Sequence, residues 1–363
     1  MVLGSVDGWG TGCLGSYWRV VPTVPLTTLL SWAWIAAVME IDNAVESAGA
    51  DRVGRLFKIS FPMWANGLRL VDEQGIAVAE LHRRAGAACN LGGLERWGWI
   101  SVGARLGQRS GYGTSRGLRA DTVIAPTRAG RYARRLFPEI AGMVEQRWRD
   151  RFGAEVFDAL REQLTLEALT LPWSPPEVHP SDGFITHVTA GEHSPQDLPL
   201  VVLLGQRLTQ RTVEEESSIP VSLPLAANVL RVVEDDQVAV VDLPARTGLS
   251  KEAIAMAVGN LDRRHLAAIN PDRSISLTAE GLTALEAYRD SVFRRGDGDD
   301  VRGALEDLLH NTEALATGLR PPDRSWRSRK PHLSRTARLL ADPTGNLPWH
   351  PMVLHRGGWP DGS

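Results

Sequence analysis

The sequence has only two cysteines in 363 residues, Cys13 and Cys89. Two cysteines are too few for a disulfide framework and are typical of a protein in a reducing cytoplasm. A long apolar run is also missing, because Glu40 and Asp42 interrupt the most apolar helical stretch. The 40 Lys and Arg residues nearly balance the 43 Asp and Glu residues, which leaves a formal charge of −3. We therefore expect a cytoplasmic protein that does not enter a membrane and has no overall attraction for polyanions.

Short motifs of the common enzyme classes are absent as well. We find no phosphate-binding glycine loop with its lysine, no zinc-ligand spacing and no nucleophile elbow. Glu40 and Asp42 stand two residues apart, and such positions do not share a helix face, so we expect a surface role for this pair. His350 and His355 lack nearby carboxylate or thiolate partners, which argues against a metal site. The sequence thus predicts no catalytic activity, no metal and no cofactor.

What the chain does contain is an internal repeat. The stretch Phe61–Gly86 aligns without a gap on Leu223–Gly248, at a constant offset of 162 positions, and 11 of the 26 pairs are identical. The identical pairs include Asn66 with Asn228, Arg69 with Arg231, Leu81 with Leu243 and Gly86 with Gly248. This offset is far longer than a solenoid period and has the length of a whole domain, so the chain is most simply two copies of one domain.

The similarity continues after this block and sets the expected boundaries. Thr127–Gly130 matches Thr278–Gly281, and the Leu-Pro-Trp-x-Pro sequence at 171–175 recurs at 347–351. We predict a disordered leader at 1–27, a first copy at 28–170, a proline-rich linker at 171–197, a second copy at 198–319 and a basic tail at 320–363. Residues 1–27 alternatively precede the true start of the protein.

The apolar spacing predicts mostly helices. Leu30, Trp34, Val38, Ile41 and Val45 recur at helical spacing, with Glu40, Asp42, Asn43 and Glu46 on the other side. In the second copy we expect a short helix at 240–246, ended by a left-handed Gly248, and a next helix from N-cap Ser250 to about His265. Strands at 266–269 and 274–277 enclose the turn sequence 270–273 and predict a β-hairpin, before Thr278 caps a long helix to Phe293.

This order of elements resembles the MarR-type winged-helix transcriptional regulators. Three stretches carry the resemblance: Val240–Lys251 (V-x-D-L-x-x-R-x-G-L-S-K), Leu261–Arg264 (L-D-R-R), and Asp272-Arg273 followed by Leu277–Gly281 (L-T-A-E-G). Over most of its length the chain is also similar to bacterial tandem members of that family, which end in a segment like Met352–Gly358 (M-V-L-H-R-G-G). The first copy joins the resemblance mainly through the internal repeat.

The resemblance implies a mainly α fold with small β-hairpin wings, in which two tandem winged-helix repeats form an intramolecular pseudo-dimer. Members of the family are usually dimers joined by their terminal helices, so the chain would act as a monomeric pseudo-dimer or as a homodimer. They often bind small ligands between this helical core and the DNA-binding lobes. Trp32, Trp34 and Trp64 are our candidates for lining a pocket for a small apolar effector, and the alternative is that they are core aromatics.

Duplex DNA is the partner that the resemblance implies. In the second copy the expected contact positions are Ser250, Lys251, Glu252, Ala255, Met256, Gly259, Arg263 and Arg273. Among the groove-facing positions of the helix only Lys251 is a cationic anchor, and bidentate base readers such as Asn or Arg are missing there. This helix is therefore expected to anchor on DNA better than it reads bases.

The first copy departs from the pattern at the recognition helix. Seven residues separate Gly86 from Leu94, against twelve between Gly248 and Leu261, so about a turn and a half is lost. The stretch 103–120 carries Arg105, Arg109, Arg116 and Arg119 and no acid. We expect this arginine-bearing wing either to contact phosphates or to be a solvated polar loop.

A second basic run extends from Arg320 to Arg338. It is expected either to bind phosphates or to cover the acidic surface around 214–216 and 234–236. The interpretation is a DNA-binding transcriptional regulator that responds to a small apolar ligand. The alternative is a winged-helix scaffold that no longer binds DNA and serves as a protein-interaction or ligand-sensing module.

Overall fold

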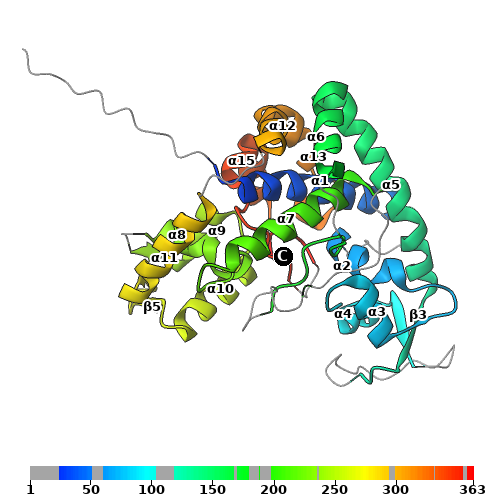
Figure 1. Ribbon diagram of the computed structural model, residues 1–363, viewed down its shortest axis with the longest axis horizontal. Helices are drawn as coiled ribbons and strands as arrows, with labels where there is room; N and C mark the ends of the chain where they lie inside the picture. The colour runs from blue at the N-terminus through cyan, green and yellow to red at the C-terminus, as the bar shows by residue number, and fades with distance from the viewer. Residues whose placement is uncertain are drawn as a thin grey trace, which may run out of the picture.

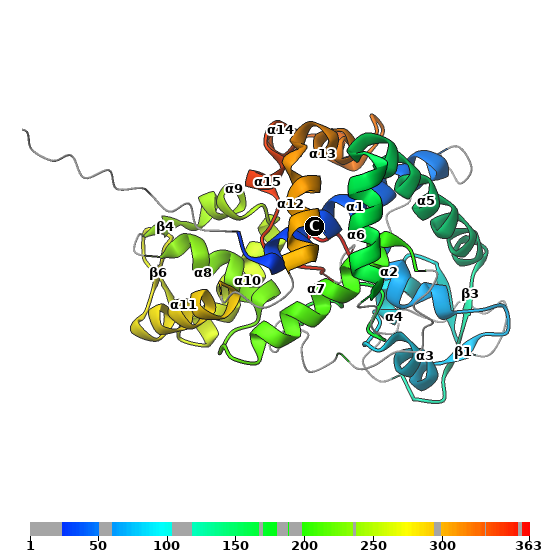
Figure 2. The same ribbon diagram turned by 45° about the horizontal axis from the view of Figure 1, so that its top comes forward.

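The computed structural model describes residues 24–50, 60–103, 118–166, 170–179, 188, 198–234, 237–293, 299–330, 332–354 and 358–363. The fold is mainly helical and contains two small antiparallel sheets, as expected. Figure 1 shows a layer of core helices with one lobe below each end, and the lobes stay at opposite ends when the molecule is turned (Figure 2). Among the described residues no helix is both long and apolar enough to cross a membrane.

The helical core is built around α1, which lies against α7 and α5. The core helices are α1 (Leu26–Ala50), α5 (Arg128–Phe152), α6 (Ala154–Leu166), α7 (Leu200–Glu216), α12 (Asp299–His310) and α13 (Thr312–Leu319). Since α1 begins at Leu26, the predicted boundary of the leader at residue 27 is wrong by two residues, and residues 1–23 lie outside the described residues.

Helix α1 is not amphipathic toward solvent, because neighbouring elements cover it on every side. The polar residues Glu40, Asp42, Asn43 and Glu46 are all buried, so the surface role predicted for Glu40 and Asp42 is wrong. Glu40 accepts hydrogen bonds from the Trp148 indole (2.8 Å) and from Arg151 of α5 (2.6 and 2.9 Å). A buried carboxylate is tolerated when it is paired in this way.

The first lobe consists of short helices on a three-stranded sheet. It comprises α2 (Phe61–Asn66), the 3-10 turn η1 (Leu68–Leu70), β1 (Ile76–Ala77), α3 (Val78–Ala85), α4 (Leu91–Arg96), β2 (Ile100–Val102) and β3 (Val123–Pro126). The strand order is β1-β3-β2, with antiparallel pairing throughout. Helix α5 leaves this sheet and carries the chain into the core (Figure 1).

The second lobe repeats that order with a longer helix. It comprises the π-helical turn η4 (Leu223–Ala227), α8 (Asn228–Val233), β4 (Val238–Ala239), η5 (Val240–Asp242), α9 (Leu243–Thr247), α10 (Lys251–Arg263), β5 (Ala267–Ile269), β6 (Ser274–Leu277) and α11 (Ala279–Val292). The strand order is β4-β6-β5, again antiparallel. The predicted helices and hairpin are confirmed to within about two residues at most ends. The strands β1 and β4 were not predicted, because two residues are too few to show an alternation.

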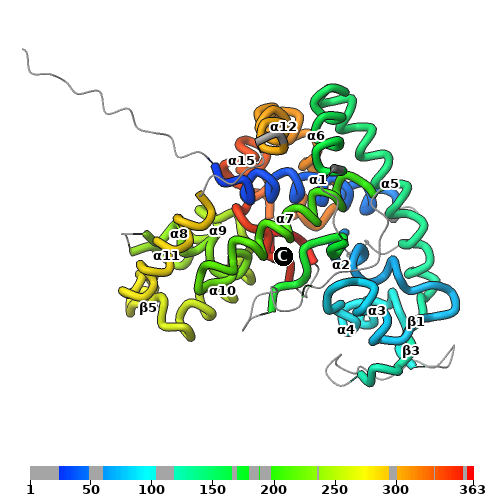
Figure 3. The backbone as a smooth tube through the Cα atoms, in the orientation of Figure 1, coloured from blue at the N-terminus to red at the C-terminus, as the bar shows by residue number. Residues whose placement is uncertain are grey.

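Two short segments join the lobes to the core, and we call them the first strap (residues 171–179) and the second strap (residues 347–354). The amide of Asn66 exchanges two hydrogen bonds with the backbone of Ser174 in the first strap (2.7 and 3.0 Å). Asn228 binds the backbone of Trp349 and His350 in the second strap in the same way (2.8 to 3.2 Å). The straps meet in the middle of the molecule, between the lobes (Figure 3).

These straps overturn the expectation of a linker followed by a tail. Val178 and Val353 are buried, and the Val178 N–H donates to the Val353 carbonyl (2.9 Å), so the two straps pair with each other. Of the predicted linker, residues 180–187 and 189–197 lie outside the described residues.

The predicted basic tail is folded as well. Residues 320–330 and 332–346 contain the 3-10 turn η6 (Trp326–Ser328) and the helices α14 (Leu333–Ala341) and α15 (Pro343–Asn346). Arg327 of η6 is buried and contacts Asn43 and Glu46 of α1. The basic run therefore pairs partly with buried acids of α1. The acidic residues that we expected this run to cover have other partners. Arg211 pairs with Glu214 and Glu215, and Arg289 pairs with Glu234.

Candidate nucleic-acid interface

The helix–turn–helix of the second lobe is shaped by two local signals. Gly248 has a φ of +74°, the left-handed conformation that lets α9 end and the chain turn. Two residues later the Ser250 hydroxyl accepts a hydrogen bond from the Ala253 N–H (3.1 Å) and caps α10. Ala253, Ile254, Ala257, Val258 and Leu261 are buried in the lobe, which leaves the opposite face of α10 toward solvent. The local sequence thus determines which face of α10 can meet a partner.

Most of the predicted contact positions of α10 lie on that solvent-facing side. Lys251, Glu252, Ala255 and Arg263 are exposed, and Met256 and Gly259 are half-buried. Within the described residues Lys251 forms no ion pair. These six positions form one stripe along the helix, as the resemblance implied.

Ser250 does not belong to this surface, which is a correction to the prediction. Only 5% of Ser250 is exposed. Its N–H donates to the carbonyl of Asp361 (2.9 Å), and its hydroxyl donates to the carbonyl of Gly362 (2.6 Å). The sequence showed the capping role of Ser250 but not the distant segment that covers it.

The hairpin of the second lobe places Arg273 at its tip. The turn is held by Asp272, whose carboxylate accepts hydrogen bonds from the Ser274 N–H and hydroxyl (2.9 and 2.7 Å). These bonds hold the pKa of Asp272 below its usual value. Arg273 has a φ of +63° and is exposed, and in the part of the chain described it has no ion-pair partner. The side chain is therefore free to reach a phosphate group.

In the first lobe the corresponding helix is much shorter. Helix α4 has six residues against 13 in α10, which agrees with the deletion seen in the sequence. Asn90 caps it by accepting a hydrogen bond from the Gly93 N–H (2.7 Å). Leu91, Gly93 and Leu94 are buried, so little of α4 remains to face a partner.

Of the four arginines predicted on the wing of the first lobe, Arg119 lies within the described residues. Arg119 is exposed and pairs with Asp121 (3.1 Å), which follows directly after the acid-free stretch 103–120. Arg105, Arg109 and Arg116 lie outside the described residues.

A polar cluster beside α4 has the chemistry of a packed interior. The Cys89 thiol donates to the Asn66 carbonyl (3.3 Å), and burial raises its pKa to about 12. Burial also raises the pKa of Glu177 in the first strap to about 7. A thiol with so high a pKa carries almost no thiolate at neutral pH, so Cys89 is not an activated nucleophile.

The three tryptophans proposed as pocket lining are core residues. Trp32, Trp34 and Trp64 are 7%, 0% and 4% exposed. Trp64 stacks on Phe137, with ring centroids 5.0 Å apart, and also lies against Trp173. Of the two interpretations of these residues, packing in the core is the one that matches their surroundings.

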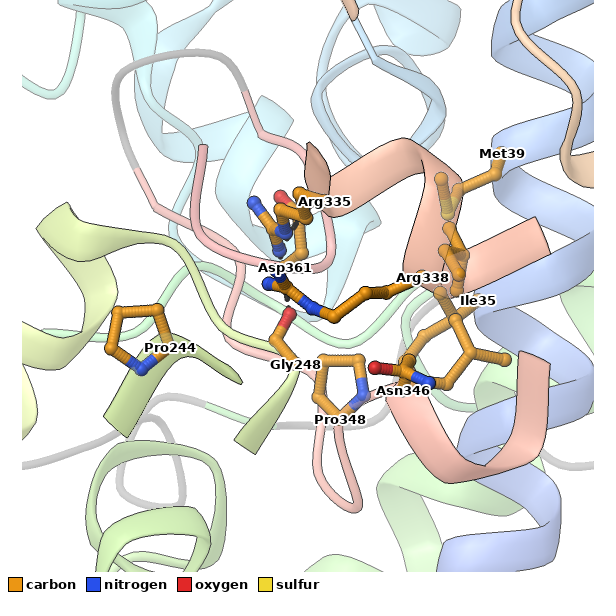
Figure 4. Close-up of a pocket in the computed structure, with 11 residues that line it drawn as sticks. Ile35, Met39, Pro244, Gly248, Arg335, Arg338, Asn346, Pro348 and Asp361 are labelled. Carbon is orange, nitrogen blue, oxygen red and sulfur yellow. Dashed lines mark hydrogen bonds and ion pairs between the residues drawn. The ribbon is translucent and has the colours of Figure 1, made fainter. Parts of the chain in front are cut away.

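A small cavity lies instead where α1, α14 and α15 meet the turn of the second lobe (Figure 4). Its volume is about 20 Å³, which is room for a water molecule and not for an organic effector. Arg335 and Arg338 of α14 point toward Gly248 and Asp361 (Figure 4). Arg335 donates to the Gly248 carbonyl (2.5 Å) and pairs with the Asp361 carboxylate (2.8 Å).

The described residues hold no cluster of His, Cys, Asp and Glu side chains that could bind a metal ion. His350 is buried, and burial lowers its pKa to about 3, so this ring stays neutral. Its Nε2 lies 3.2 Å from the Tyr288 hydroxyl, which gives the imidazole a structural role between the second strap and α11.

Comparison with known proteins returns no match: no family model, no curated protein and no solved structure matches this chain.

Proposed function

We propose that this chain is a DNA-binding transcriptional regulator of the MarR type, in which two winged-helix units form one intramolecular pseudo-dimer. The order helix, left-handed glycine, helix and hairpin in both lobes supports the winged-helix assignment. Both lobes lie on the same side of the core, so the two lobes can face the same DNA duplex (Figure 1).

Matched contacts in the two halves support the pseudo-dimer. Asp42 of α1 accepts a hydrogen bond from the Phe61 N–H (2.8 Å), and Glu216, the last residue of α7, accepts one from the Leu223 N–H (2.5 Å). Phe61 and Leu223 are equivalent positions of the sequence repeat. Each half therefore uses a carboxylate from its core helix to cap the first helical turn of its lobe.

The straps add a reciprocal exchange between the halves. Ser31 of α1 donates to the Pro348 carbonyl of the second strap (3.3 Å). Gly205 of α7 lies against the Trp173 carbonyl of the first strap, where a side chain would meet it. Counted back from Asp42 and Glu216, Ser31 and Gly205 occupy equivalent positions, and each touches the strap of the other half. Such an exchange is what an approximate two-fold axis produces.

The observation that best supports DNA binding is the exposed face of α10 beside the hairpin. Lys251 and Arg263 lie at the two ends of this face, and Arg273 is at the hairpin tip. Three cations spread along a helix and its wing can contact phosphates on both sides of a groove. The apolar Ala255 and Met256 between them predict limited base readout.

The test is duplex binding at several salt concentrations, measured by fluorescence anisotropy on random and genomic DNA. We expect affinity to fall with salt, with a log–log slope that loses about 0.9 for each phosphate contact removed. The variant Lys251/Arg263/Arg273→Ala should bind more weakly and with a flatter slope. A matched control, Arg135/Arg147/Arg149→Ala, removes three exposed cations of α5 and should leave the slope nearly unchanged.

A second candidate function is a scaffold that has lost DNA binding. Two observations favour it: the shortness of α4 and the cover over the first turn of α10. If the wild-type chain binds no duplex even at low salt, the scaffold function is the correct one. Equal losses in the test variant and in the control would also sink the assignment of α10 as the contact helix.

A small apolar effector is not part of this proposal. The tryptophans that would bind it are packed in the core, and the cavity beside α14 is too small for it.

A further inference from the structure

Residues 358–363, which we call the latch segment, lie on the first turn of α10. The Ser250 N–H and hydroxyl donate to the carbonyls of Asp361 and Gly362. Gly362 has a φ of +79°, and a Cβ atom at this position would overlap the side chain of Ala253. The backbone of the latch segment therefore touches α10 so closely that only glycine fits.

The latch segment is anchored at both of its ends. Trp359 is buried, and its ring is covered by the Arg327 guanidinium (4.2 Å to the centroid) and by Trp326 (5.7 Å). The carboxylate of Asp361 pairs with Arg335 of α14 (2.8 Å), which is about one-quarter exposed. The Trp359 end rests on a buried aromatic ring, whereas the Asp361–Gly362 end has no apolar side chain and is held by the two hydrogen bonds from Ser250 and one partly exposed ion pair. The second end is the one that can open.

The covered turn is the part of a recognition helix that normally enters the major groove. In helix-turn-helix proteins the N-terminal residues of that helix reach the base edges. Here the latch segment covers Ser250 and lies against the side chain of Ala253, whereas Lys251 and Glu252 of the same turn stay exposed. A DNA strand brought to this end of the helix would meet the latch segment as a steric obstacle.

Resting on the proposed function, we infer that the latch segment is an autoinhibitory contact that competes with duplex DNA for the first turn of α10. The closed form holds the turn, and only the open form docks it fully in a groove. Apparent affinity then equals the affinity of the open form multiplied by the open fraction. Any change that opens the Asp361–Gly362 end tightens DNA binding until the open form predominates.

The test uses the full chain with Gly362→Ala, which places a Cβ atom against Ala253. The matched control is Gly153→Ala, the same change at another positive-φ glycine (+91°) where a Cβ atom meets nothing. A second variant, Asp361→Asn, removes the attraction to Arg335 without adding a cation beside the contact helix. Hydrogen exchange of the Ser250 amide reports opening directly, without DNA.

We expect Ser250 to exchange at least tenfold faster in Gly362→Ala and in Asp361→Asn, and duplex affinity to rise about tenfold, which corresponds to a tenfold larger open fraction. The Gly153→Ala control should match the wild type in both measurements. The result that overturns the latch is faster exchange at Ser250 with unchanged or weaker DNA binding.

Two further outcomes are distinct from that one. Unchanged Ser250 exchange in both variants would show that these contacts do not hold the segment, which also overturns the inference. Failure of the opened variants and the wild type alike to bind any duplex at low salt would reject the proposed function itself, and the latch with it.

Discussion

The two lobes share the contacts that hold them to the core and differ in the helix that would face a ligand. Asn66 and Asn228 bind the two straps, and Arg69 and Arg231 stack on the strap tryptophans (4.1 and 4.5 Å to the ring centroids). Helix α4, in contrast, has six residues and α10 has 13. The residues common to both copies are therefore mainly those of assembly, and the exposed helix is where the copies have diverged.

The second lobe also shows what covers its contact helix. The latch segment closes the first turn of α10 in the second lobe. In the first copy the matching Asp182 and Gly183 lie outside the described residues. The residues that are identical in the two copies are mainly those that pack the lobes on the straps. A difference in function between the lobes is therefore expected at the helices α4 and α10, where the copies differ.

The strap asparagines provide the largest expected effect. Replacing Asn228 by Ala leaves three buried backbone groups of the second strap without their partner, and we expect a loss of about 4 kcal/mol in unfolding free energy. Asn66→Ala strands two such groups and should cost about 3 kcal/mol. Urea denaturation measures both. A loss below 1 kcal/mol in either variant would show that the straps are not essential to assembly.

Gly130 and Gly281 follow the hairpins of the two lobes at equivalent positions of the repeat, and replacing each by Ala tests whether the two lobes are packed in the same way. A Cβ atom at Gly130 would overlap the Trp99 carbonyl oxygen, and one at Gly281 would overlap the Leu266 carbonyl oxygen. Each Ala substitution should therefore destabilise the protein by about 2–3 kcal/mol, and by similar amounts. Ala at Gly142, where a Cβ atom meets nothing, is the control and should not destabilise the protein. Thermal melting of the three variants decides whether the two sites are equivalent.

The capping carboxylates predict a pH dependence that differs between the halves. Burial raises the pKa of Asp42 to about 8 and that of Glu216 to about 7. A raised folded-state pKa contributes stability that is fully present below the unfolded-state value near 4 and is lost as pH rises through the folded-state value. Stability should therefore fall between pH 6 and pH 8.

Neutral isosteres isolate each contribution to that fall. Asp42→Asn should remove about 2 kcal/mol of the change between pH 6 and pH 8, and Glu216→Gln about 1 kcal/mol. Urea denaturation at the two pH values measures the difference from wild type. An unchanged pH profile in Asp42→Asn would contradict the raised pKa of this carboxyl.

The smallest effect is expected from the wing of the first lobe. We expect Arg105/Arg109/Arg116/Arg119→Ala to weaken duplex binding by less than tenfold, about 1 kcal/mol, because Arg119 already pairs with Asp121. The Lys251/Arg263/Arg273→Ala variant of the second lobe should lose more. A larger loss from the wing would reverse the ranking of the lobes and make the first lobe the main DNA contact.

Part of the fold could be predicted because its signals are local. Gly86 and Gly248 end helices in the left-handed conformation, and Ser250 and Thr278 cap the helices that follow. Such caps depend on residues within four positions, so one sequence suffices to place them. The hairpin of the second lobe was predicted on the same basis.

The candidate site was predicted less completely. The exposed stripe of α10 follows from the helical period, which also buries Ile254 and Leu261. The residues that bury Ser250 lie more than 100 positions away in the sequence, so no local sequence pattern predicts this contact. The four acidic and amide residues on α1 were assigned to solvent because helical spacing cannot show that a helix is enclosed on all sides.

The sequence by itself determined the duplication, the helix caps, the hairpin and the shortened helix of the first copy, because each depends on neighbours along the chain. Only the tertiary structure decided that the presumed linker and tail are straps and a latch. Their proline and arginine content is typical of an exposed segment, and their burial follows from partners such as Asn66, Asn228 and Ser250 that folding brings from far away. Contacts between distant residues leave no periodic trace in one sequence, so packing alone reveals them.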